Sequence, residues 1–62
     1  MITLTRLNGQ PVMLNCDLIE SAVRNGETVI TLTTGNVVIV HDGLEEIEEK
    51  VVAFKRKVNR QD

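Results

Sequence analysis

The chain has 62 residues and a formal net charge of −2, with one cysteine, one phenylalanine and neither tryptophan nor tyrosine. This length allows one domain over residues 1–62, the single cysteine excludes an internal disulfide, and no apolar run reaches the ~20 residues of a membrane helix. Because the charge balance is also slightly acidic, we expect a cytoplasmic chain with no membrane insertion and no DNA or RNA partner.

The first predicted unit is a β-hairpin with strands at about 2–6 and 10–15, where apolar residues alternate with polar ones. Its turn could contain two residues, Asn-Gly, or three, Leu-Asn-Gly. We favour the three-residue loop at positions 7–9, with its glycine in the left-handed conformation. This loop pairs Leu4 with Val12 and gathers the apolar side chains on one face.

A third strand is predicted at about 18–24. It is followed by Asn-Gly at positions 25–26, the residue pair that best suits a two-residue hairpin turn. The register that this turn sets gives three cross-strand pairs: Ile19–Leu32, Ser21–Ile30 and Arg24–Glu27.

The central feature is a second hairpin, with strands at about 28–33 and 36–41 joined by a two-residue loop at positions 34–35. A strand that is apolar on both faces is usually covered on both, so we expect this hairpin to lie at the centre of the fold. The predicted core face carries two pairs, Ile30–Ile39 and Leu32–Val37, and the opposite face carries Val29, Val38 and Val40.

A C-terminal helix is predicted at about 43–58, with Asp42 as N-cap and Glu45 completing a capping box. The acidic residues at 45–49 and the basic residues at 55–60 suit the two ends of the helix dipole. Apolar residues recur at helical spacing and form one stripe: Leu44, Ile47, Val51, Phe54 and Val58.

These elements predict an α+β fold that is mostly β, a small antiparallel five-stranded meander of two hairpin units followed by one C-terminal α-helix. A core of this size with a single aromatic residue and no disulfide or metal favours a homo-oligomer, most commonly a dimer. The alternative is that the first hairpin closes a monomeric barrel. The candidate interface residues are Val29, Val38, Val40, Val52, Phe54 and Val58.

Few residues have the chemistry of a catalytic or metal site. The single thiol, Cys16, and the single imidazole, His41, lie in different predicted elements without a third orienting group. Adding Asp17 and Asp42 gives no recognised metal-ligand spacing. We therefore predict no catalytic residues, no metal and no cofactor.

Three segments in order resemble the FlbD family of bacterial flagellar proteins, also called SwrD. They are the Thr-Arg-Leu-Asn-Gly opening at 5–9, the Asn-Cys-Asp-Leu-Ile segment at 15–19, and the Thr-x-Ile-x-Leu strand at 28–32 followed by Gly35. The resemblance covers nearly the whole chain. The sequence departs from the family pattern only in predicted loops.

The resemblance implies a non-enzymatic accessory of flagellar motility that supports motor power or stator function through protein contacts. Its expected place is the inner face of the flagellar motor, with motor or stator components as partners. The rival hypothesis is a small nucleic-acid-binding regulatory β module. Binding to nucleic acid that weakens steeply as salt rises would favour this rival.

Overall fold

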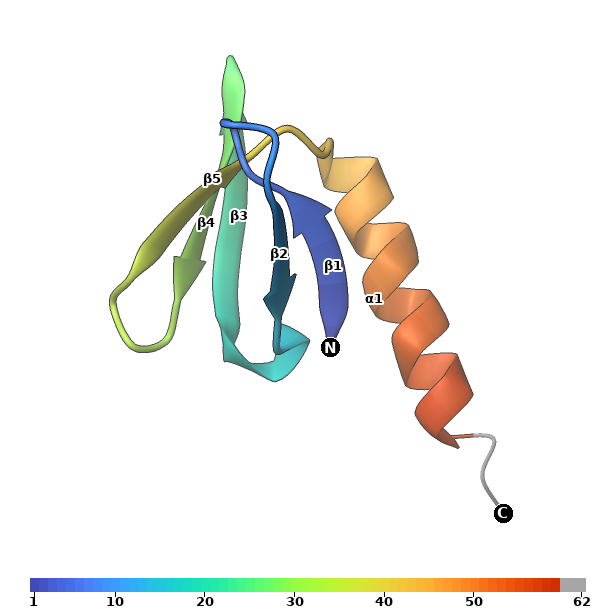
Figure 1. Ribbon diagram of the computed structural model, residues 1–62. Coiled ribbons are helices and arrows are strands. Elements are labelled where there is room, and N and C mark those ends of the chain that lie inside the picture. Colours follow the sequence, from blue (N-terminus) through green and yellow to red (C-terminus); the bar gives the residue numbers. More distant parts are fainter. Residues whose placement is uncertain (60–62) are drawn as a thin grey trace.

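The computed structural model describes residues 1–59, which form five strands, one short 3-10 helix and one α-helix (Figure 1). The strands are antiparallel and form a two-stranded sheet, β1-β2, and a three-stranded sheet, β3-β4-β5. The predicted fold class, five antiparallel strands before one C-terminal helix, is confirmed. The elements are β1 (Ile2–Thr5), β2 (Pro11–Leu14), η1 (Cys16–Leu18), β3 (Ile19–Asn25), β4 (Glu27–Leu32), β5 (Val37–Val40) and α1 (Leu44–Asn59).

The β1–β2 hairpin has the predicted register, with Leu4 opposite Val12. The N–H of Arg6 donates to Gln10 C=O and the N–H of Gly9 donates to Arg6 C=O, both at 2.8 Å, so the loop contains three residues. Gly9 has a φ of 90°, which side chains other than glycine rarely tolerate. The three-residue loop is therefore confirmed.

The β4–β5 hairpin closes through the same kind of turn, and the predicted two-residue loop is wrong. The N–H of Leu32 donates to Asn36 C=O at 2.8 Å, and the N–H of Gly35 donates to Leu32 C=O at 2.9 Å. Gly35, with a φ of 94°, is thus the third residue of a three-residue loop, as Gly9 is in the first hairpin.

The longer loop shifts the β4–β5 register by one residue, so the predicted pairing of Ile30 with Ile39 is wrong. Ile30 lies opposite Val38 instead. Because side chains alternate between the two faces of a strand, a shift of one residue exchanges the faces of β5. Val38 and Val40 are therefore buried, whereas Val37 and Ile39 are exposed.

The β3–β4 turn also differs from the prediction. Gly26 alone, with a φ of 79°, separates the paired residues Asn25 and Glu27. A β-bulge near the start of β3 compensates for this difference and restores the predicted pair Ile19–Leu32. Between the bulge and the turn, two predicted pairs are wrong: Ser21–Ile30 and Arg24–Glu27.

The end of β1 links the two sheets. Arg6 forms an antiparallel bridge with Val40, and the N–H of His41 donates to Thr5 C=O at 2.8 Å. The first hairpin and α1 consequently lie on the same side of the three-stranded sheet (Figure 1).

The core lies between that sheet, β1 and α1. Ile30 is fully buried and Leu4 and Val40 almost so, and Thr28 is buried beside them. Half-buried side chains from β2, β3 and α1 pack around this centre. The other buried apolar residues are Ile2, Cys16, Val38 and Ile47.

The helix begins one residue later than the predicted cap requires, and the proposed capping box of Asp42 with Glu45 is wrong. The equivalent contact is shifted by one residue, since Glu46 Oε1 accepts a hydrogen bond from the N–H of Gly43 at 2.9 Å. Asp42 is therefore free to bind elsewhere.

Asp42 holds α1 against β1. Its carboxylate accepts a hydrogen bond from the N–H of Thr5 at 2.7 Å and pairs with Lys50 Nζ at 3.3 Å, and Lys50 also donates to Thr3 C=O at 2.7 Å. Burial raises the pKa of the Asp42 carboxyl. The hydrogen bond from Thr5 and the Lys50 ammonium together lower this pKa by more than burial raises it, so the pKa lies below 3.8. These contacts hold the helix on one side of the three-stranded sheet.

A candidate protein-contact surface

The side of the three-stranded sheet that faces away from α1 is apolar and exposed. Val23, Val29 and Ile39 lie directly opposite one another on β3, β4 and β5 and form one row across the sheet. Val23 is 57% exposed and Ile39 is 38% exposed, while Val29 between them is half-buried. No element of the described chain covers this row (Figure 1).

A second row lies beside the first on the same side of the sheet. It consists of Ser21, Thr31 and Val37, of which Val37 is 56% exposed. The N–H of Leu7 donates to Ile39 C=O at 3.3 Å, which places the exposed Leu7 at the end of the first row. We define the outer face as Leu7, Val23, Val29, Val37 and Ile39.

The outer face arises because β5 is apolar at all four positions. In a half-buried strand, polar residues normally alternate with apolar ones and mark the solvent side. The sequence Val-Val-Ile-Val offers apolar side chains to both sides, and the core takes only Val38 and Val40. The other two side chains remain in solvent next to Val23 and Val29.

The structure separates the predicted interface residues. Val29 belongs to the outer face, but Val38 and Val40 are buried in the core and unavailable for contact, which corrects that part of the prediction. The three predicted helix residues lie away from the outer face, on α1. Of these, Phe54 is half-buried against the core, while Val52 and Val58 are exposed.

The prediction missed most of the outer face, namely Leu7, Val23, Val37 and Ile39. The signal that would have found them is the resemblance between the two glycine turns. Had Thr-Thr-Gly been given the same three-residue loop as Leu-Asn-Gly, the register of β5 would have followed and exposed Val37 and Ile39.

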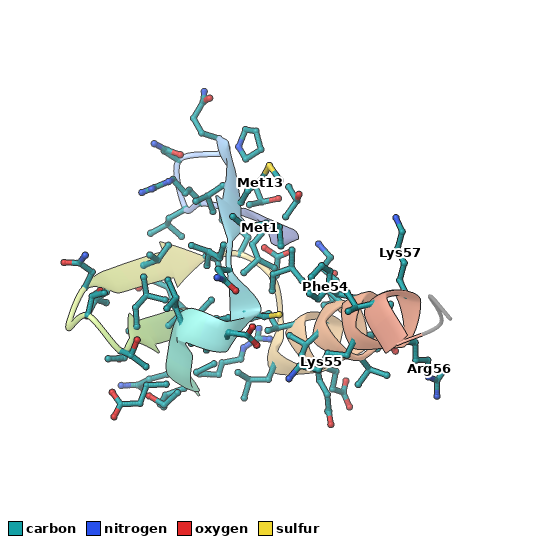
Figure 2. The ribbon with its side chains drawn as sticks, turned by 90° about the horizontal axis from the view of Figure 1, so that it is seen from below. Met1, Met13, Phe54, Lys55, Arg56 and Lys57 are labelled. Atoms are coloured by element: carbon teal, nitrogen blue, oxygen red, sulfur yellow. The ribbon has the colours of Figure 1, made fainter. Side chains whose placement is uncertain are left out.

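The basic end of α1 forms no single patch in the described part of the chain. Figure 2 shows Lys55 and Lys57 leaving the helix on opposite sides. Lys55 lies 3.9 Å from Asp17 Oδ1 in η1, an exposed pair of little energetic weight. Arg60, the last member of the predicted basic cluster, lies outside the described residues.

Cys16 and His41 are not brought together. Cys16 is buried in η1, whereas His41 follows β5 at the opposite end of the sheet, where its Nε2 lies 2.9 Å from Leu7 C=O. Within residues 1–59, no three His, Cys, Asp or Glu side chains are grouped so that they could hold a metal ion. Nor is any helix in this range long and apolar enough to span a membrane.

The fold and the outer face together define a small β-rich protein with an exposed surface of the kind that proteins use for contact. The family model for flagellar and swarming motility proteins, FlbD, matches residues 1–59, and the chain belongs to this family. The predicted resemblance is confirmed. No curated protein and no solved structure matched the chain. Membership implies a role in flagellar and swarming motility, and the family is one of motility proteins, not of enzymes.

Proposed function

We propose that this chain is a non-enzymatic accessory of the flagellar motor, which supports motor power or stator function through protein contacts at the inner, cytoplasmic face of the motor. Family membership indicates the process, which is flagellar and swarming motility. The exposed apolar outer face is the observation that supports protein contact as the way in which the chain acts. The proposal needs no reaction centre.

The composition of the outer face favours protein contact. The centres of protein interfaces are apolar and depleted in charged residues. Both rows of the outer face match this description, since their members are aliphatic or carry a small hydroxyl group. An apolar surface that is contiguous across three strands commonly marks an interaction site.

The outer face is also backed by the core. The strands that carry it present Thr28, Ile30, Val38 and Val40 on their other side, and all four are buried in the core. A surface fixed in this way loses little conformational freedom when a partner binds, which favours affinity. The outer face is therefore suited to act as a preformed docking surface.

Swarming of a bacterium that carries this chain tests the proposal. We expect Val23→Glu, which places a charge in the apolar row, to slow swarm expansion while the protein is still produced and flagellar filaments are still assembled. Met13→Glu is the matched control, because Met13 is 64% exposed on the β1–β2 hairpin, apart from the three-stranded sheet (Figure 2). This control should swarm like the parent.

Two results would count against the proposal. Normal swarming of Val23→Glu, with the variant present at the parent's level, would mean that the outer face has no part in motility. Loss of filaments in that variant would instead indicate a role in flagellar assembly and not in motor output.

A further inference from the structure

We infer that the outer face is covered by the outer face of a second copy of this chain. The two three-stranded sheets would pack face to face around a two-fold axis. The inference shares its contact surface with the proposed function, and it goes further by naming the occupant.

The outer face matches itself chemically. Its two rows contain no charged side chain, so the face offers nothing to a partner that recognises charge. In a symmetric dimer each patch meets an identical patch, which requires a surface without unpaired charge at its centre. Branched aliphatic side chains and threonine methyl groups from two such faces can interdigitate, as the inner faces of stacked sheets do.

The charges at the rim are compatible with this packing. The row next to Val23 and Val29 is the polar pair Asn25 and Glu27, at one end of the sheet. The other end consists of the uncharged turn at residues 33–36, which joins β4 to β5, and the β3 bulge with the exposed Glu20. A two-fold axis perpendicular to the strands places the Glu27 end of each copy over the uncharged turn of the other. The two Glu27 carboxylates then remain apart.

The outer face supplies a substantial part of the area that a small dimer needs. At ~3.4 Å per residue and ~4.8 Å between strands, seven-residue β3 and its neighbours β4 and β5 give a face of roughly 24 Å by 14 Å. This flat area of roughly 340 Å² is about two fifths of the ~800 Å² per partner of a standard interface. The polar rim can supply the remainder.

The other exposed surfaces are less suited to a second copy. The free edge of β3 is interrupted by the bulge between Ile19 and Ser21, and bulges at edges hinder strand pairing. In the described part of α1 the exposed large apolar residues are separated along the helix: Leu44, Val52 and Val58. Val52, near the middle, lies between Glu49 and Arg56 in the sequence. A helix pair there would have charged side chains at its centre.

The mass of the purified full chain in solution tests the inference. By light scattering after size exclusion at micromolar concentration, we expect about 13.8 kDa, twice the chain mass of 6.9 kDa, falling toward 6.9 kDa on dilution. Val23→Glu and Ile39→Glu should each give a folded chain of 6.9 kDa, whereas Met13→Glu should keep the mass of the parent. Circular dichroism reports the folding of each variant.

Should Val23→Glu fail to fold, Val23→Thr replaces it, because threonine keeps the β-branched shape and removes one methyl contact. It should raise the concentration needed for dimerisation. A parent that remains at 6.9 kDa at every concentration overturns the inference, and so does a dimer whose mass Val23→Glu leaves unchanged. A tetramer or ring overturns the two-fold arrangement.

The mass measurement tests the dimer and the swarming assay tests the proposed function, and either hypothesis can be refuted without the other. A monomeric parent whose Val23→Glu variant cannot swarm would retain the proposed function and assign the outer face to a motor component instead of a second copy. A dimeric parent whose monomeric variant swarms normally would retain the dimer and refute the proposed function.

Discussion

Asp42 shows how one residue can position an entire element. Its carboxylate lies 8% exposed between α1 and β1, where it receives a backbone hydrogen bond from Thr5 and the ammonium of Lys50. The sequence suggested a helix cap for Asp42, because local spacing matched a capping box. The partner 37 residues earlier in the chain, Thr5, left no local signal and could not be predicted.

Asp42→Asn tests this contact through the pH dependence of stability. Because the pKa of Asp42 is below 3.8 in the folded chain, its ionised form stabilises the fold above that pH, and this stabilisation is lost as the pH falls through the folded-state pKa. Asparagine keeps an acceptor for Thr5 but loses the charge facing Lys50. We expect the variant to be less stable than the parent at neutral pH, with the difference shrinking below pH 3.8. Urea midpoints that differ equally at every pH would contradict this.

At the scale of elements, both hairpins have a three-residue loop that ends in glycine, but the prediction was correct for the first loop and wrong for the second. In the first hairpin, only the three-residue loop gathers Leu4 and Val12 on one face, so hydrophobic pattern selects the loop length. In the second hairpin, β5 is apolar at all positions from 37 to 40, and either register buries valine or isoleucine. Pattern alone could not select the register there, and the choice of faces was wrong.

The register of β4 and β5 makes a direct prediction about stability. Ile30 is fully buried, so Ile30→Ala should cost about 2–5 kcal/mol through lost burial and a cavity. Ile39 is 38% exposed, and Ile39→Ala should cost about 1 kcal/mol or less. Denaturant midpoints should be compared at concentrations where the chain is monomeric. A larger loss for Ile39→Ala would mean that the predicted two-residue loop is correct after all.

At the scale of the whole molecule, one side of the three-stranded sheet is covered and the other is not. The sequence was sufficient to predict the five strands, the final helix, the family and the presence of apolar side chains on both faces of the β4–β5 hairpin. It was not sufficient to name the residues of that face, because Val38 and Val40 exchange places with Val37 and Ile39 when the turn gains one residue. An error of one residue in a loop therefore assigned the wrong β5 side chains to the candidate site, whereas Val29 on β4 was assigned to the correct side of the sheet.

Site-specific photocrosslinking in swarming cells tests most directly whether the outer face is a contact surface. A photoreactive side chain at position 23 lies in the outer face, while one at position 13 is similarly exposed on the β1–β2 hairpin. We predict a crosslinked product from position 23 at about 13.8 kDa, twice 6.9 kDa, and little product from position 13. Equal yields from the two positions, or no product from position 23, would contradict the account.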